Sequence, residues 1–386
     1  MTIAGFMLLR PIFQLAEQYA GGVTVAFSGI FFCWTLYLIA RGRARFSRFE
    51  LIFFLYFIIA IPVSLIYDAS ISSVISNFNK LFLCFFCLKA FSQPGPWFKS
   101  VGWYRVFQVI TYACSGYVIV SLALPSSYAI EWGAKTFEMA FSHQHLAATF
   151  IIALISNVYF DMDETRRSFW TAKFLLASIL MYALLMTGAR TFTFCGAMLY
   201  VFILSRYLRV VDRRIRPMVF FVVAAVVGAY VFQHAGDFTF FQKNDNLSTE
   251  SFTNGRDDIW GYYGKTFLES NLIEQLFGQG VAFLENSSLG IGTHNDVLFF
   301  AISFGVIGLV LYFVFVVFEI LKPGLNLATL AAVASFVFCA LMNGFSGYTD
   351  YIVALAAFVA SYSGVSCMSG TYSVGSQIRA EKWEAR

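Results

Sequence analysis

The chain has 386 residues, of which 59% are hydrophobic and only 12% are charged, and its mean hydropathy is +0.70. This small number of charged residues could not cover the surface of a soluble domain. We therefore expect lipid to solvate most of this chain. The net charge of +4 comes from basic residues spread over many loops, which argues against a nucleic-acid partner.

Apolar runs long enough to span a membrane follow one another along the chain, and they are continuous rather than alternating, which excludes a β-barrel. Residues 1–20 form a further candidate, either a short span or an amphipathic surface helix. The sequence therefore predicts an all-α, polytopic membrane protein with 11–12 transmembrane helices in a single domain, residues 1–386. The runs are 22–40, 51–67, 74–91, 104–124, 145–160, 173–188, 191–206, 217–233, 295–320, 327–343 and 351–367.

Lys and Arg residues gather in every second connection between these runs, and cytoplasmic loops carry such an excess. The basic connections are therefore predicted to lie inside the cell, and the alternate loops outside it. The largest outward loop is 234–294, too short for an independent soluble domain. The basic residues include Arg41, Arg43, Arg45, Arg48, Lys89, Lys99, Arg105, Arg166, Arg167, Lys173, Arg206, Arg209, Arg213, Arg214, Arg216 and Lys322.

Lys80 is the one cation clearly within a predicted span. An ionisable group there is costly in lipid, so it is expected to face a polar cavity, where it could contact a lipid-linked phosphate.

His143 and His145 flank Gln144 at the entry to the span that begins near Leu146. A His-x-His pair can bind a metal, but no Cys or acidic cluster is spaced to supply further ligands. We therefore predict no metal and no cofactor, and we expect this pair to line a polar outer cavity.

Arg190 lies in Thr187-Gly-Ala-Arg190, a tight outward turn between two spans. Its planar fork of donors could grip a phosphate. The alternative is an arginine that snorkels to the headgroup level.

Arg256 marks the expected start of a helix on the outer surface, with Asn254 or Gly255 as its cap and Trp260 as an interfacial anchor. Asp257 beside it is a further candidate for substrate contact. The alternative for Arg256 is a surface salt bridge with the adjacent acids, which would contribute little.

His294 precedes Asn295, Asp296 and a long apolar run. An imidazole at the outer membrane boundary could accept a proton from a sugar hydroxyl. The alternative is helix capping, a role that Thr293 or Asn295 could fill instead. Together with the three cations, His294 suggests a diphosphate leaving group and a hydroxyl nucleophile.

Four short motifs resemble, in order and spacing, the C-terminal signature of the O-antigen ligase/polymerase family. They are Arg256-Asp-Asp-Ile-Trp260, Leu276-Phe-Gly-Gln-Gly280, His294-Asn-Asp and Phe304-Gly-Val-Ile-Gly-Leu309. Thr187-Gly-Ala-Arg190 resembles that family's upstream arginine motif, in which Ser often stands where this chain has Ala189.

The resemblance implies a metal-independent glycosyltransferase of the bacterial inner membrane, GT-C-like in fold, whose site faces the periplasm. Its donor would be a glycan on undecaprenyl diphosphate. Arg190 and Arg256 would bind the diphosphate, and His294 would orient or deprotonate the acceptor hydroxyl. The loop 234–294 would be a short periplasmic helical loop. The remaining candidates for substrate contact are Lys80, His143, His145, Asn295 and Asp257.

The leading interpretation is a polysaccharide polymerase that joins lipid-linked repeat units, with membrane lipid and a chain-length regulator protein as further partners. The alternatives are an O-antigen ligase that transfers finished glycan to lipid A–core, and a transporter of lipid-linked sugars. A transporter is expected to place paired charges and broken helices near the bilayer midplane, and in the sequence only Lys80 fits that pattern.

Overall fold

The computed structural model places the residues that carry most of the predicted spans. It describes residues 6–40, 46–67, 69–91, 101–131, 134–164, 169–210, 214, 256–281, 283, 293–322, 324–344, 351 and 355. The chain divides into two compact units, each built from separate stretches of sequence. Unit 1 comprises Met1–Thr24, Gln93–Leu247 and Val353–Arg386, and unit 2 comprises Val25–Ser92 and Ser248–Ile352.

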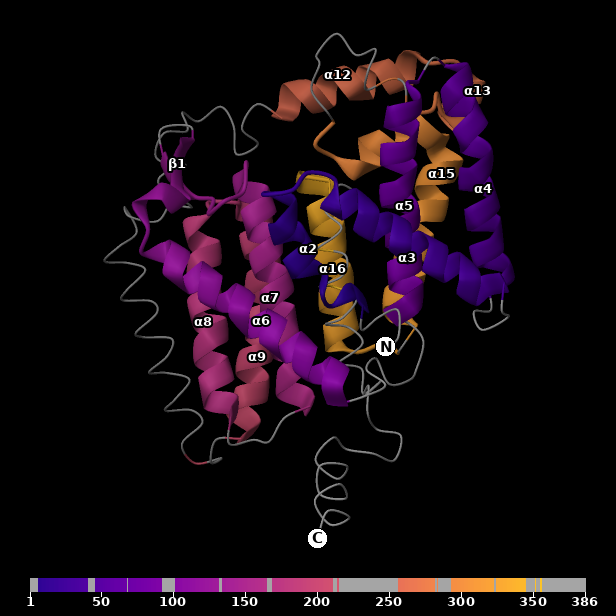
Figure 1. Ribbon diagram of the computed structural model, residues 1–386. Coiled ribbons are helices and arrows are strands. Elements are labelled where there is room, and N and C mark those ends of the chain that lie inside the picture. The colour runs from indigo at the N-terminus through magenta and orange to yellow at the C-terminus, as the bar shows by residue number, and fades with distance from the viewer. Residues whose placement is uncertain are drawn as a thin grey trace. The chain divides into compact units, whose positions relative to one another are not determined.

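Unit 1 is a helical bundle with a small β-hairpin, and the sequence did not predict the hairpin. The helices α7, α8 and α9 lie side by side (Figure 1). Strands β1 and β2 pair antiparallel, with Tyr128 opposite Phe137. The elements in chain order are α2 (Arg10–Glu17), α6 (Val101–Leu122), η1 (Pro125–Ser127), β1 (Tyr128–Glu131), β2 (Ala134–Phe137), α7 (Gln144–Glu164), α8 (Trp170–Met186) and α9 (Arg190–Val210).

Helix α2 lies in the described part of the first twenty residues, 6–20. It has 8 residues, and at about 1.5 Å per residue such a helix is far too short to cross a bilayer. Its polar side chain Gln14 is buried and donates to the carbonyl oxygen of Leu146 at 3.0 Å. From α7, the Asn157 amide donates to the carbonyl oxygen of Leu8 at 3.1 Å. The segment therefore packs against α7 through polar contacts and is not a span.

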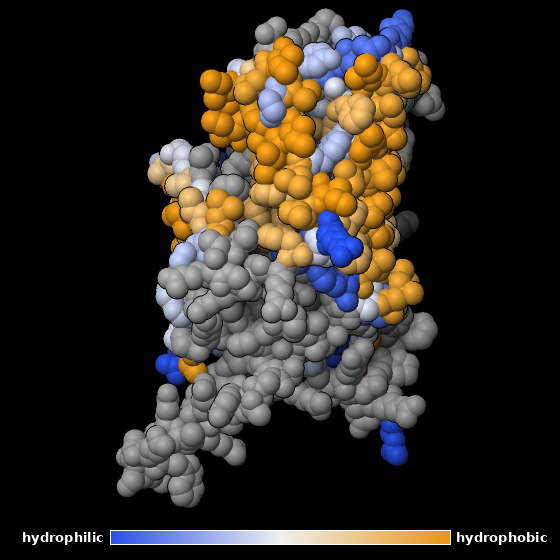
Figure 2. Space-filling view, turned by 90° about the vertical axis from the view of Figure 1, so that its right-hand side faces the viewer, coloured by the Kyte–Doolittle hydropathy of each residue, from blue (hydrophilic) through white to orange (hydrophobic). Residues whose placement is uncertain are grey.

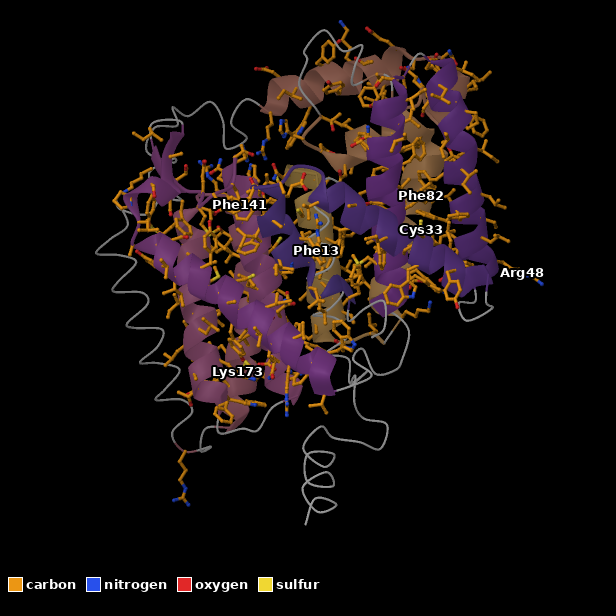
Figure 3. The ribbon with its side chains drawn as sticks, in the orientation of Figure 1. Phe13, Cys33, Arg48, Phe82, Phe141 and Lys173 are labelled. Carbon is orange, nitrogen blue, oxygen red and sulfur yellow. The ribbon has the colours of Figure 1, made fainter. Side chains whose placement is uncertain are left out.

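A buried carboxylate joins three helices of unit 1. Asp161 on α7 is 1% exposed and pairs with Lys173 of α8 at 2.5 Å. From α6 it accepts hydrogen bonds from the hydroxyls of Tyr104 and Tyr112 and from the amide of Gln108. A buried charge is tolerated only when it is paired and hydrogen-bonded, and this one is both. Figure 3 shows Lys173 near one end of this bundle, with Phe141 near the other.

Unit 2 is held together by aromatic side chains from α4, α5 and α15. The rings of Phe53 and Phe315 stack with centroids 4.4 Å apart, and Phe85 stacks on both, at 5.1 and 4.7 Å. Offset ring pairs of this kind stabilise a core beyond the area they bury. The helices are α3 (Val23–Ala40), α4 (Arg48–Ile66), α5 (Ile71–Phe91), α12 (Arg256–Glu269), α13 (Leu272–Phe277), α15 (Asp296–Leu321) and α16 (Leu327–Met342).

Helix α15 is broken at Gly305, whose φ of 67° and ψ of 178° are not helical. The ring of Phe300, before the break, stacks on that of Tyr312, after it, with centroids 3.8 Å apart. In a straight helix these two residues would be separated by about 18 Å along the axis. The two halves of α15 are therefore bent toward each other.

Groups from outside the helix satisfy the carbonyls that the break releases. Backbone amides of Gln279 and Gly280 donate to the carbonyl oxygens of Ile302 and Ser303, both at 2.9 Å. The Tyr56 hydroxyl donates to the carbonyl oxygen of Phe304 at 2.6 Å. In lipid each unsatisfied carbonyl would cost several kcal/mol, so these donors are what make the break tolerable.

The predicted spans that fall within the described residues are helical. Each predicted span within the described ranges coincides with a helix, and 217–233 and nearly all of 351–367 lie outside those ranges. Among described residues, 5 helices (α4, α6, α7, α9 and α15) are long and apolar enough to cross a membrane, and α8 and α16 are shorter apolar helices. Hydrophobic residues cover much of the described face in Figure 2. A mostly helical chain suited to a multi-pass membrane protein is thus confirmed.

Candidate functional site

Buried ion pairs define one end of unit 2. Glu50 near the start of α4 meets Lys89 near the end of α5 at 2.5 Å, and Lys322 just after α15 at 3.4 Å. Lys322 also pairs with Glu319 at 3.2 Å. Burial alone would lower the pKa of Lys322, but the carboxylates of Glu319 and Glu50 outweigh it and raise the pKa. The predicted cytoplasmic cations Lys89 and Lys322 are thus gathered at one end, which we call the ion-pair end.

The opposite end of unit 2 carries the helices of the large predicted loop, and we call it the loop end. There α12 lies crosswise over α15 (Figure 1). The hydroxyl of Tyr67, after the last turn of α4, donates to the Glu274 carboxylate of α13 at 3.2 Å. Burial and this carboxylate raise the pKa of Tyr67, so the hydroxyl remains a donor. Lys89 and Lys322 thus lie at the end of unit 2 opposite to this loop.

Arg256 begins α12, as the sequence predicts, and ties it to the end of α16. Its guanidinium donates to the carbonyl oxygen of Met342 and, at 3.0 Å, to the side-chain oxygen of Asn343. A cation beside the last carbonyls of a helix is electrostatically favourable. These two contacts hold the guanidinium of Arg256 in place at the end of α16. The side chain of Asp257 lies outside what the structure describes.

His294 is exposed and has a φ of 48°, in the left-handed region. The capping role falls to Asn295, whose side-chain oxygen accepts from the backbone amide of Leu298 at 3.2 Å. Thr293 supports this turn by donating to the carbonyl oxygen of Asn295 at 3.0 Å. The helix start thus does not require the imidazole. A non-glycine residue in this conformation carries strain of about 1–3 kcal/mol, a feature found often at functional sites.

Arg256 and His294 share the loop end through the segment that follows α16. Asn343 accepts from Arg256, and the next residue, Gly344, lies so close to Asp296 that an added Cβ would be 2.9 Å from its carboxylate oxygen. Asp296 in turn follows His294 by two positions. The structure therefore brings two of the three predicted catalytic residues to one end of one unit.

Arg190 lies at the first position of α9 in unit 1, immediately after a tight turn. Gly188 has a φ of 67°, and the backbone amide of Ala189 donates to the Thr187 hydroxyl at 3.2 Å. The Nε and Nη2 atoms of Arg190 are shielded from solvent and have no hydrogen-bond partner among the described residues. A snorkelling arginine would hold these atoms in water or headgroups. Shielded donors beside a helix N-terminus suit an anion instead.

His143 and His145 lie at the start of α7, also in unit 1. Their ring centroids are 4.7 Å apart, and the backbone amide of His145 donates to Nδ1 of His143 at 3.1 Å. The His145 ring meets the edge of Phe192 on α9 at 5.7 Å. Among the described residues, no group of three or more His, Cys, Asp or Glu side chains is arranged to hold a metal ion.

The predicted residues are thus divided between the two units. Unit 1 holds Arg190, His143 and His145, whereas unit 2 holds Arg256 and His294. Lys80 is on α5, but its side chain is not among those described. Convergence of both arginines and His294 in one pocket stays a prediction.

Sequence reasoning missed Asn343 and Asp161. Asn343 follows an apolar run and carries no motif, so only its contact with Arg256 reveals it. Asp161 could have been noticed as a carboxylate at the very end of a predicted span, facing three polar residues of α6 spaced four apart, Tyr104, Gln108 and Tyr112.

No family model, curated protein or solved structure matches the chain. The resemblance to the O-antigen ligase/polymerase family therefore rests on the short motifs and their order.

Proposed function

We propose that the chain is a glycosyltransferase that polymerises a polysaccharide, moving a glycan from undecaprenyl diphosphate to the hydroxyl of a lipid-linked repeat unit. The observation that carries the proposal is Arg190 at a helix N-terminus, whose shielded Nε and Nη2 atoms have no hydrogen-bond partner in the part of the chain that the structure describes. This arrangement suits a phosphate group held close to the membrane. The enzyme would lie in the bacterial inner membrane with its site facing the periplasm.

In the proposed reaction, the acceptor oxygen attacks the anomeric carbon of the donor sugar while its proton passes to His294. The bond from that carbon to the diphosphate oxygen breaks, and undecaprenyl diphosphate leaves with the electron pair. Arg190 and Arg256 stabilise the negative charge that develops on the leaving group, so no metal ion is required. Attack from the face opposite the leaving group inverts the configuration.

Transfer of finished glycan to lipid A–core uses the same bond changes, so an O-antigen ligase remains the alternative within this class. The acceptor distinguishes the two. A polymerase extends a lipid-linked repeat unit, and in the cell a chain-length regulator protein would set the length of its product.

The test is an assay of the purified full-length protein in lipid vesicles with a lipid-linked repeat unit as sole substrate. Arg190→Ala should lower the rate of chain extension by about 10²–10³-fold. Lys135→Ala is the matched control. Lys135 is, like Arg190, a basic residue of unit 1, but its side chain is exposed. An unchanged rate in the Arg190 variant, or extension by neither protein, would refute the proposal.

Two features favour transport of lipid-linked sugars as a second candidate, namely the break in α15 and the buried ion pairs. Against it, the carbonyls at the break are satisfied by Gln279, Gly280 and Tyr56 and so leave no evident ion site. Movement of a labelled lipid-linked sugar across vesicles that lack any acceptor would establish transport and exclude the transferase as the primary activity.

A further inference from the structure

The corner between α12 and α13 leaves large apolar side chains uncovered. Leu268, near the end of α12, is 74% exposed, and Leu272 and Ile273, at the start of α13, are 70% and 71% exposed. Phe277, one turn after Ile273, is 52% exposed. Single apolar residues on a surface need no explanation, whereas several large ones in one short segment indicate an interaction surface.

Side-chain hydrogen bonds hold this corner in a defined shape. The Gln275 amide donates to the carbonyl oxygen of Ser270 at 2.9 Å and so caps the end of α12. Asn271 and Glu274 form a reciprocal capping box at the start of α13. The Gln279 amide donates to the Ser270 hydroxyl at 2.7 Å. These hydrogen bonds fix the backbone of the corner, so the exposure of its apolar residues is a property of the folded segment.

The apolar corner continues the exposed side of α4. Tyr67, directly after α4, is hydrogen-bonded to Glu274 of α13, and the preceding Ile66 is 76% exposed. Ile59, two turns earlier, is 64% exposed. Helix α4 has a mean hydropathy of 2.4 over its span and is only 28% buried within the protein, as expected of a helix that faces lipid. Figure 2 shows the side of the molecule to which these helices belong, where hydrophobic residues dominate.

The same element also carries a water-facing side. Lys265 and Glu269 on α12 form an exposed pair at 3.7 Å, with side chains 75% and 67% exposed. Exposed apolar residues beside an exposed charged pair, at the end of a helix long enough to span, are typical of a segment that lies in a membrane interface.

We infer that Leu268, Leu272, Ile273 and Phe277 form a membrane-docking surface. These side chains enter the interfacial region of the same bilayer that α4 crosses, and their partner is the hydrocarbon of the lipids. Docking holds α12 at a constant depth. The inference concerns this surface alone and does not rest on the proposed transferase activity.

The test measures the depth of nitroxide labels on the full-length protein in lipid nanodiscs. The label is attached at Ile273→Cys or, as the matched control, at Lys265→Cys on the charged side, with the exposed native Cys33 replaced by Ser. Collisions with oxygen, which concentrates in lipid, are compared with collisions with a water-soluble nickel chelate. We expect the oxygen-to-nickel ratio at position 273 to be at least severalfold higher than at position 265.

Two results would overturn the inference. Equal ratios at both positions would place the corner in water. Low collision rates with both reagents at position 273, together with spin–spin broadening that disappears when unlabelled protein is added, would show that a second copy of the chain covers the surface. A label at Phe277→Cys repeats the measurement one turn away and must agree with that at position 273.

Discussion

At the scale of single residues, His294 combines an exposed imidazole with a left-handed backbone, and the two features can be tested separately. Asn tolerates the left-handed region better than most residues but cannot act as a base in the proposed role. We predict that His294→Asn folds normally and lowers the rate of chain extension by about 10²–10⁴-fold, as loss of a general base does. The measurement is the extension rate together with the thermal stability of the purified variant. Full activity in His294→Asn would show that only the backbone conformation matters.

Arg256 has a structural contact and a proposed catalytic role, and the variant Asn343→Ala tests the contact separately from the role. Asn343→Ala removes one acceptor from the guanidinium, while leaving the charge in place. We predict a loss of about 1–3 kcal/mol in the free energy of unfolding for this variant, because a donor loses its partner, and chain extension within about tenfold of the unsubstituted rate. Arg256→Ala should abolish extension.

The control for both variants is Lys265→Ala, which removes an exposed α12 cation whose ion pair contributes little. Equal losses of activity in Asn343→Ala and Arg256→Ala would assign Arg256 a structural role alone.

At the scale of elements, the spans were predictable because continuous apolar runs have one stable form in lipid, the helix. The break in α15 was not predictable, because Val297–Ile320 is one continuous apolar run in the sequence. The segment around Gly278 packs closely against α15 at Gly305, and this close approach explains why both positions are glycine. A Cβ on Gly305 would overlap the Leu276 backbone, and one on Gly278 would overlap that of Ser303. The β-hairpin at 128–137 was missed because its strands have four residues each.

The break gives a prediction about stability. Gly305→Ala combines a positive φ with a backbone overlap, so it should lower the free energy of unfolding by more than about 2 kcal/mol. Gly264→Ala on α12 is the matched control, because an added Cβ there meets nothing within 4 Å and alanine favours a helix. The measurement is the thermal unfolding midpoint in detergent. Similar midpoints for the two variants would mean that α15 straightens at little cost.

At the scale of the whole molecule, the sequence predicts a site to which both halves of the chain contribute. Each unit carries part of the predicted set near a helix start, Arg190 in unit 1 and His294 with Arg256 in unit 2. Lys and Arg predict which loops face the cytoplasm, because that prediction depends only on the composition of the loops. The convergence of Arg190, Arg256 and His294 in one pocket depends on packing between distant segments, which no local pattern records, so it stays a prediction.

A double-mutant cycle tests whether the two arginines act on one leaving group. If they do, the losses in chain-extension rate from Arg190→Ala and Arg256→Ala should not add, because either loss already disrupts the same transition state. Additive losses in the free energy of activation would indicate independent sites. The pair Lys135→Ala and Lys265→Ala serves as the control cycle, for which no coupling is expected.

The carboxylate at Asp161 has a consequence for biogenesis. Its hydroxyl and amide donors on α6 are synthesised before it, but its counter-ion Lys173 on α8 is synthesised after it. An uncompensated charge partitions poorly into hydrocarbon. The ion pair can form only after α8 has been synthesised, so we expect α6, α7 and α8 to complete their packing together.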